Sequence, residues 1–211
     1  MKFYDFSMAP SPRKVRMLIQ EKGLDIPTEQ IDLRSKQQFT DEFRQINPNC
    51  TVPVLQLDDG KIICESEAIC RYLEELHPEP ALFGSSAWEK AQVNEWSRRI
   101  ELDGYLAVAE AFRNRGSFYK DRAIPGTLPV EQIPDLIQRG TKRVKHFYTQ
   151  LDQELEQQSS QWLAGEQFSM ADIMAYIVID FSKRLELQPE PGLGALHAWY
   201  QRVAQRPSAQ C

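Results

Sequence analysis

The chain has 211 residues, of which 42% are hydrophobic and 26% are charged, and it carries a net charge of −5 at pH 7. Its apolar runs are all shorter than the roughly 20 residues that cross a bilayer, and its first residues lack the apolar segment of a secretory signal. We therefore expect a cytoplasmic globular protein with no membrane partner, and with no nucleic-acid partner because neither half of the chain is basic.

The chain begins with an alternation of strand and helix patterns. A β-prone run over 2–8 is followed by a helix pattern over 11–23. Val15, Leu18 and Ile19 share one face of that helix, and a glycine ends it.

Four more elements follow: a strand over 27–33, a short helix over 40–48, a hairpin over 51–66 and a helix over 66–78. The hairpin turns at the Asp-Asp-Gly sequence, which is a strong turn signal. In the last helix Ile69, Leu73 and Leu76 share a face. The order βαβαββα is typical of a thioredoxin-like domain.

Strand signals nearly stop after this point. Prolines and a glycine predict a linker over 79–86, and residues 87–211 accept helical spacing almost throughout. Three prolines and two glycines predict one long irregular connection over 116–134, and connections of that length are often functional. The predicted fold is thus an α/β thioredoxin-like domain over 1–78 joined to an all-α helical bundle.

Val52-Pro53, at the start of the hairpin, is the first motif with a functional interpretation. Proline lacks an N–H, so at a strand start it faces an edge or a ligand. If the Val52–Pro53 bond is cis, the Val52 N–H and C=O would turn outward and pair with an extended peptide. A plain edge-strand proline is the alternative.

Glu65-Ser66, where the hairpin turns into a helix, is the second. A serine hydroxyl together with the N–H groups of a first helical turn makes an anion site. The alternative is that Ser66 is an N-cap with no ligand.

Together these motifs, in "NPNCTVPVLQLDDGKIICESEAI", and the later stretch "WLAGEQFSMADI" resemble the cytosolic glutathione S-transferases, in particular bacterial and fungal theta-like members. The resemblance covers essentially the whole chain. In the later stretch Ser169 and Asp172 form a capping box with Phe168 and Ile173 as a hydrophobic staple. This matches a structural motif at the start of a buried helix in the second domain of that family.

The resemblance implies a set of contacts with glutathione. The main chain of Val52, which precedes Pro53, would pair with the cysteinyl part of the peptide. Glu65 and Ser66 would hold the γ-glutamyl amine and carboxylate.

At the glycine end of the peptide, the resemblance implies a contact from Gln38, with Lys36 as a charged alternative. Thr51 stands where the family often has lysine or glutamine, and it follows Cys50. This departure from the family pattern leaves the glycine-end contacts open.

The resemblance also implies that the attacking group is the thiol of glutathione, so that the protein stabilises a thiolate and needs no covalent nucleophile of its own. The usual catalytic position falls on Ala9, which has no donor. Ser11 is our candidate catalytic residue, although Ser followed by Pro12 is also the expected pair at a helix N-cap. Other candidate donors are the first-turn N–H groups of this helix and the side chains of Ser117, Tyr119 and Lys120.

The site of the second substrate is expected between the two domains. Tyr105, Ala109 and Phe112 have the spacing of one helical face and would form an apolar wall, joined by Met8 and Tyr119. Core packing is the alternative for such a stripe. Halogenated aromatics, epoxides, enones and peroxides all remain open as electrophiles.

The chain has four cysteines, Cys50, Cys64, Cys70 and Cys211, with neither C-x-x-C nor paired metal spacing with the three histidines. We therefore expect no metal and no cofactor, with glutathione as co-substrate, and we interpret Cys50 as a bystander. The resulting prediction is a homodimeric glutathione transferase of detoxification that conjugates a small, mostly apolar electrophile. Two alternatives are a non-catalytic interaction module, which Ala9 favours, and glutathione-dependent reduction of a peroxide or disulfide.

Overall fold

The computed structural model describes residues 1–211, which form two compact units. The first unit comprises residues 1–80, 125–128 and 211, and the second comprises 81–124 and 129–210.

The first unit is built on a four-stranded sheet in the order β2-β1-β3-β4. Its strands are β1 (Lys2–Asp5), β2 (Thr28–Gln30), β3 (Val54–Gln56) and β4 (Ile62–Cys64). β1 pairs in parallel with β2 and antiparallel with β3, and β3 pairs antiparallel with β4. With three helices between and after the strands, the order βαβαββα and the predicted thioredoxin-like class are confirmed.

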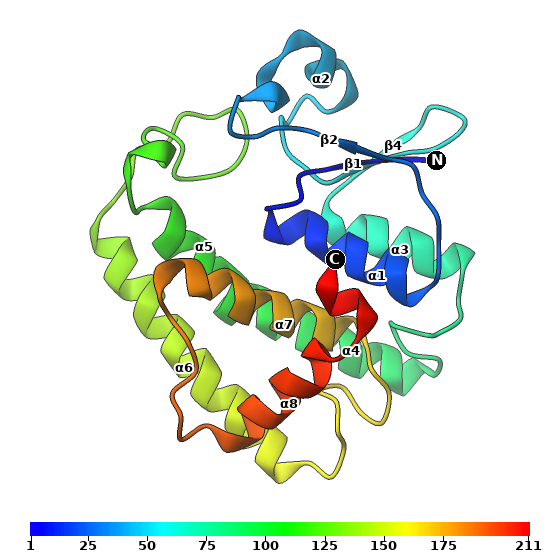
Figure 1. Cartoon of the computed structure of the whole chain (residues 1–211), viewed down its shortest axis with the longest axis vertical. Coiled ribbons are helices and arrows are strands. Elements are labelled where there is room, and N and C mark those ends of the chain that lie inside the picture. The colour runs from blue at the N-terminus through cyan, green and yellow to red at the C-terminus, as the bar shows by residue number, and fades with distance from the viewer. The chain divides into compact units, whose positions relative to one another are not determined.

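Both faces of this sheet are covered. In Figure 1, α1 (Pro10–Glu21) and α3 (Ser66–Leu76) lie together on one face, and α2 (Asp41–Ile46) lies on the other. A cluster of buried apolar residues forms around one face of the strands: Tyr4, Ile31, Phe43 and Val54. Because successive strand residues point to opposite faces, Phe3 and Leu55 are buried on the other side.

The structure corrects three local predictions. α1 begins at Pro10 with Ala9 as its N-cap, so Ser11 is not the N-cap. Proline suits the first helical position because its fixed φ is helical and its missing N–H costs no hydrogen bond there. α3 begins at Ser66 and its N-cap is Glu65, so the N-cap interpretation of Ser66 is also wrong. Leu76, predicted on the apolar face of α3, is 49% exposed because it is the last residue of the helix.

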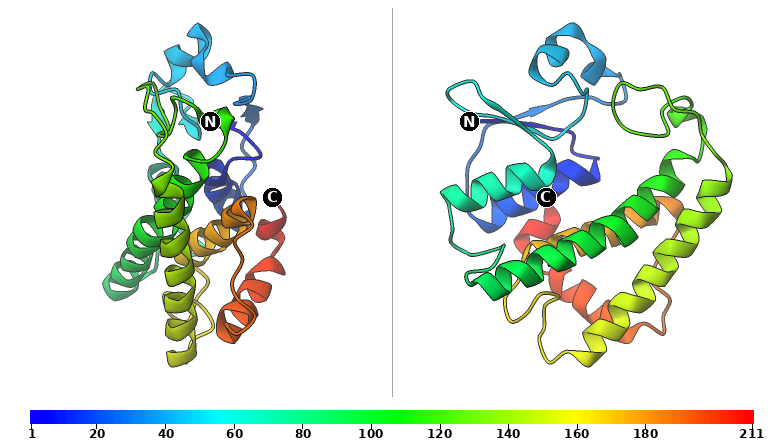
Figure 2. Two further views of the ribbon diagram at one scale, coloured as in Figure 1. Left: turned by 90° about the vertical axis from the view of Figure 1, so that its left-hand side faces the viewer. Right: turned by 180° about the vertical axis from the view of Figure 1, so that it is seen from behind.

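The second unit is helical, as predicted. Its helices are α4 (Ala87–Arg99), α5 (Leu106–Arg113), α6 (Asp135–Gln157), α7 (Met170–Ser182) and α8 (Gly194–Ala204). A π-helical segment, Ile100–Tyr105, joins α4 to α5, and Figure 2 shows the three as one rod beside α6. Short 3-10 turns lie at Gln37–Phe39 in the first unit and at Ser117–Tyr119, Lys183–Leu185 and Pro207–Gln210 in the second.

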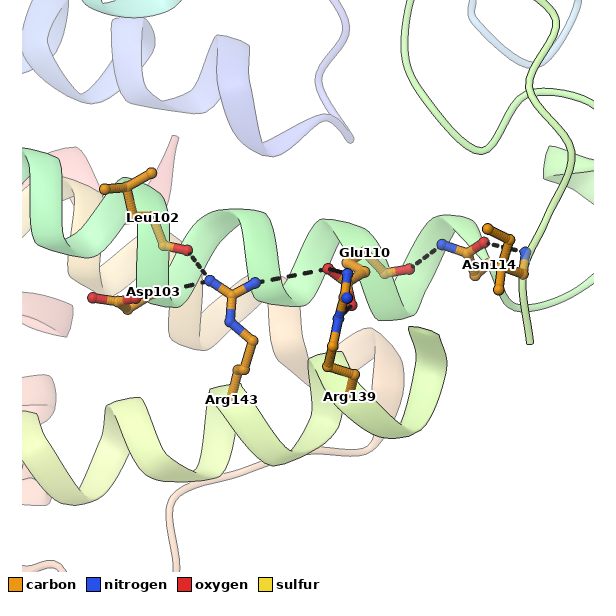
Figure 3. Close-up of polar contacts among 7 residues, drawn as sticks. Leu102, Asp103, Glu110, Asn114, Arg139 and Arg143 are labelled. Atoms are coloured by element: carbon orange, nitrogen blue, oxygen red, sulfur yellow. Dashed lines mark hydrogen bonds and ion pairs between the residues drawn. The ribbon is translucent and has the colours of Figure 1, made fainter. Parts of the chain in front are cut away.

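The π-helical segment is held from α6. The N–H of Leu106 bonds to the carbonyl of Glu101, five residues back, instead of four. Arg143 donates to the Leu102 carbonyl in this widened turn (Figure 3). Nearby, Arg139 makes two hydrogen bonds of 2.8 and 2.9 Å to the carboxylate of Glu110, which ties α6 to α5.

The predicted capping box at the start of α7 is present, formed by Ser169 and Asp172. Phe168 and Ile173, the predicted staple, are both buried. α7 is the central helix of the second unit, because every residue in it except Asp180 is buried.

Candidate active site

The turn between β1 and α1 contains the position where the family resemblance places the catalytic group. Ala9 caps α1 without a side-chain hydrogen bond. Pro10 and Pro12 have no N–H, so Ser11 alone carries a backbone N–H among the first three helical residues. Two of the predicted first-turn N–H donors are therefore absent. Ser11 carries the backbone N–H and the side-chain hydroxyl of this turn.

A closed polar network holds this turn. Asp5, at the end of β1 and 1% exposed, accepts hydrogen bonds of 2.6 Å from Arg16 Nη1 and from Gln30 Nε2. Arg16 Nη2 donates to the Ser7 carbonyl at 2.9 Å, and the Ser7 N–H donates to Gln30 Oε1 at 2.8 Å. Strand, turn and helix are thus fixed to one another by a carboxylate and a guanidinium. This network was not predicted, although a charged residue at the end of an apolar strand was a signal for it.

The Val52–Pro53 bond is cis. Val52 precedes β3, and its N–H and C=O take no part in a backbone hydrogen bond. The buried side chain of Asn47 holds the segment before it, because its Nδ2 donates to the Thr51 carbonyl at 2.8 Å and to the Thr51 hydroxyl at 3.1 Å. The Val52 main chain is therefore positioned without being occupied by the sheet.

Glu65 and Ser66 lie where β4 turns into α3. Glu65 has φ 70° and ψ 126°, an unusual conformation for a residue with a side chain, which turns the chain sharply into the helix. Its side chain is exposed, and Ser66 is buried at the first helical position. The first-turn N–H groups of α3 begin at Ser66.

Gln38 lies in the 3-10 turn of residues 37–39 and is only 6% exposed. Its Oε1 atom is buried and has no hydrogen-bond partner. Lys36, the alternative candidate, is exposed and has a left-handed backbone conformation at the start of the same turn.

Desolvation disfavours the thiolate form of three of the four cysteines. Burial raises the pKa of the Cys70 thiol far above its usual range, and it also raises the pKa values of Cys64 and Cys211. Cys50 is buried, with its sulfur 3.6 Å from the Pro48 carbonyl. No group of three or more His, Cys, Asp or Glu side chains is arranged to hold a metal ion.

The residues predicted for the electrophile wall lie together in the second unit, apart from Met8. The Tyr105 and Phe181 ring centres are 5.9 Å apart, those of Phe112 and Phe181 are 5.1 Å apart, and those of Phe112 and Tyr119 are 5.3 Å apart. We call these four residues, Tyr105, Phe112, Tyr119 and Phe181, the aromatic cluster. Phe181 was missed because it lies on α7, far away in sequence.

Met8 belongs to the first unit and is 43% exposed, in contact with Arg34. Its predicted place beside the aromatic cluster stays a prediction.

The long connection after α5 is fastened to the end of that helix. Arg113 donates to the carbonyls of Ala123 and Arg122, at 3.1 and 2.6 Å. Asn114 accepts from the Ile133 N–H at 2.7 Å, and Gln132 donates to the Arg113 carbonyl at 2.8 Å. The predicted irregular segment is therefore an ordered loop.

Comparisons with known proteins agree with this architecture. The model of the glutathione S-transferase N-terminal domain matches residues 9–76, and that of the C-terminal domain matches residues 130–207. Glutathione S-transferase 2 of Saccharomyces cerevisiae is 32% identical over 215 residues, covering 100% of this chain and 88% of the yeast protein. This chain belongs to the glutathione S-transferase family.

Further matches show the breadth of activities among relatives. The crystal structure of a glutathione S-transferase domain-containing protein from Marinobacter aquaeolei VT8 is 32% identical, has a TM-score of 0.89, and each chain covers 99% of the other. The disulfide-bond oxidoreductase YfcG of Escherichia coli is 28% identical, covering 96% of this chain and 90% of the relative. None of the helices in this glutathione S-transferase family member is both long enough and apolar enough to cross a membrane.

Proposed function

We propose that this protein binds glutathione on its first unit and transfers the glutathione thiol to a small, mostly apolar electrophile. The observation that carries the proposal is the register of the β3–β4 hairpin. Val54 pairs with Cys64, so the Val52 segment that enters β3 and the Glu65-Ser66 segment that leaves β4 lie at the same end of the hairpin. A peptide that pairs with the Val52 main chain would therefore bring its charged γ-glutamyl end to the first turn of α3.

That first turn suits the γ-glutamyl group. The N–H groups at the start of a helix have no partner within the helix, and the helix dipole places partial positive charge there. We propose that the Ser66 N–H and hydroxyl receive the γ-glutamyl carboxylate and that the exposed Glu65 carboxylate pairs with the amine.

At the other end of the peptide, the buried Oε1 of Gln38 supports a contact with glutathione. A buried acceptor with no partner costs about 1–3 kcal/mol, and the Gln38 side chain would relieve this cost by turning outward to the glycyl N–H of the peptide. We propose that Gln38 binds the glycine end, with Thr51 beside it and Pro53 fixing the chain between the two ends.

The remaining chemistry is activation of the sulfur. A thiol with a pKa of about 8.5 is only roughly 3% ionised at pH 7, and each unit of depression raises this nearly tenfold. We propose that the N–H and hydroxyl of Ser11 stabilise the thiolate, since the two neighbouring prolines supply no donor. The thiolate then forms a bond to the electrophilic carbon, and a leaving group departs or a proton is added.

The first test is the ultraviolet absorbance of the bound glutathione thiolate between pH 5 and 9, against free glutathione. We expect a depressed thiol pKa, and we expect Ser11→Ala to reverse part of the depression without loss of glutathione affinity at pH 5, where the thiol is protonated. Binding with an unshifted thiol pKa would contradict enzymatic activation and favour a non-catalytic binding module.

A second candidate is glutathione-dependent reduction of a peroxide or disulfide, which uses the same peptide site. The similarity to the disulfide-bond oxidoreductase of Escherichia coli favours it. Coupling glutathione oxidation to NADPH through glutathione reductase distinguishes the two, because conjugation consumes glutathione without forming its disulfide.

We further propose that the protein acts as a two-fold homodimer in the cytoplasm and serves detoxification. Sedimentation at micromolar concentration tests the dimer, and a monomer there would remove it.

A further inference from the structure

Asn47 follows the last residue of α2 and is fully buried, and its N–H closes the last turn of that helix. Its carbonyl accepts from the Cys50 N–H at 2.9 Å. In its side chain, Oδ1 accepts from the Asn49 N–H at 3.0 Å. Nδ2 donates to the Thr51 carbonyl at 2.8 Å and to the Thr51 hydroxyl at 3.1 Å. Asn47 therefore holds the whole segment that leads to Val52.

The partners of the Asn47 amide allow it only one orientation. The Asn49 N–H needs an acceptor, whereas the Thr51 carbonyl needs a donor. The turn between these two residues is one that the chain does not adopt freely, because Cys50 has φ 55°, in the left-handed region. The hydrogen bonds of Asn47 thus hold a strained turn in a single conformation.

The bond to the Thr51 carbonyl sets the direction of the Val52 N–H. The peptide bond between Thr51 and Val52 is trans. In a planar trans peptide the C=O and the N–H point to opposite sides. Because the Thr51 carbonyl points at the buried Asn47 amide, the Val52 N–H points away from it. The same bond polarises the peptide group and makes the Val52 N–H a stronger donor.

We propose that Asn47 is a positioning residue for glutathione, because it aims the Val52 N–H at the cysteinyl carbonyl of the bound peptide. This inference rests on the proposed function, since it explains how the same site holds its ligand. Binding completes one chain of hydrogen bonds, from the Asn47 amide through the Thr51–Val52 peptide group to the ligand. Less conformational entropy is lost on binding, because this peptide group is fixed before the ligand arrives.

Asn47→Asp tests the Nδ2 donor alone. The carboxylate keeps an oxygen that accepts from the Asn49 N–H, but it places a second oxygen against the Thr51 carbonyl, which turns that peptide group away. We expect the affinity for S-methylglutathione at pH 8, measured by calorimetry, to decrease about tenfold. This ligand has no ionisable thiol, so the result does not depend on thiolate stabilisation. Asn47→Ala, which also lacks the donor but adds no charge, should show a loss of the same order.

Asn114→Asp is the matched control. Asn114 is also buried, and it belongs to the second unit. Its Nδ2 donates to the Glu110 carbonyl at 2.8 Å, and its Oδ1 accepts from the Ile133 N–H at 2.7 Å. The substitution therefore removes the same kind of bond and should lower the urea midpoint as Asn47→Asp does. It should leave the affinity for S-methylglutathione within about twofold.

A measurement on the wild type covers the case in which neither Asn47 variant folds. In ¹⁵N-edited NMR spectra, S-methylglutathione should shift the Val52 amide proton downfield. It should also shift the Asn47 Nδ2 protons, because both groups donate within one hydrogen-bond chain. The Nδ2 protons of Asn114 should not move.

The outcomes separate this inference from the proposed function. Equal binding of S-methylglutathione to the wild type and to the folded Asn47 variants would overturn the role of Asn47 and leave the peptide site intact. If the variants do not fold, Asn47 Nδ2 signals that stay in place when the ligand binds the wild type would overturn it. If S-methylglutathione does not bind the wild type, both proposals fail.

Discussion

Asp172 is fully buried at the start of α7, and its replacement by asparagine tests how the second unit is held together. Its Oδ1 accepts from the Leu163 N–H at 3.0 Å and from Trp199 Nε1 at 2.8 Å. Its Oδ2 accepts from the N–H and the hydroxyl of Ser169, at 3.0 and 3.1 Å. Four donors thus converge on one carboxylate.

Asparagine has the same shape but presents one oxygen and one NH₂ group. If its oxygen faces Leu163 and Trp199, its NH₂ meets the Ser169 N–H, so that a donor faces a donor. An unsatisfied buried donor costs about 1–3 kcal/mol, and two charge-assisted bonds become neutral ones. Replacing the carboxylate also removes a buried charge, which offsets part of this cost. We therefore expect the free energy of unfolding to fall by about 2 kcal/mol at pH 7, which lowers Tm by roughly 4–8 °C.

The stability lost on Asp172→Asn should decrease as pH rises. Burial raises the pKa of Asp172 from 3.8 to about 6, although its hydrogen bonds act in the opposite direction. The folded protein therefore binds this proton more tightly than the unfolded chain does. The contribution of Asp172 to the free energy of unfolding is greatest below pH 3.8. It falls by up to roughly 3 kcal/mol as pH rises through 6.

Urea unfolding of the wild type and Asp172→Asn at pH 5 and pH 8 measures both quantities, with the exposed Asp25→Asn as control. We expect a larger penalty at pH 5. An unchanged midpoint at both pH values, or a penalty that increases with pH, would refute this account of the buried carboxylate.

Three further variants test other parts of the structure. Lys22→Met should lower the free energy of unfolding, measured in urea, by about 3 kcal/mol. The reason is that the fully buried Lys22 ammonium donates to two carbonyls after α3 and lies 2.7 Å from the Glu74 carboxylate. A decrease below about 1 kcal/mol would show that the pair contributes little to stability. Gly140→Ala should cost about 1–3 kcal/mol, because its Cβ would lie 2.6 Å from a carbonyl oxygen of α5, whereas Gly192→Ala meets nothing within 4 Å and should be neutral. Asp5→Asn should loosen the β1–α1 turn, so that the depression of the glutathione thiol pKa shrinks while glutathione affinity stays within about twofold; a large loss of affinity instead would place this network under the peptide site.

The start of α1 illustrates how far local sequence rules reach. Ser-Pro is a frequent N-cap pair, and on that rule the helix would begin at Pro12. The structure begins it at Pro10, because two prolines spaced by one residue both fit the first turn and the earlier one takes the first position. Proline at the first helical position fits either choice, but Ala9 is a poorer N-cap than Ser11, so the choice follows from how the chain leaves β1, which the local rule does not describe.

The sequence by itself determined the order of strands and helices, the hairpin, the capping box of α7 and the motifs around Val52 and Ser66. These features depend on neighbouring residues, through turn propensity, side-chain period and N-terminal hydrogen bonds. Only the tertiary structure decided that Asp5 meets Gln30, that Phe181 joins the aromatic cluster, and that Arg184 lies over its rings. Such pairs are far apart in the chain, and their contacts follow from sheet pairing and helix packing, which no local pattern records.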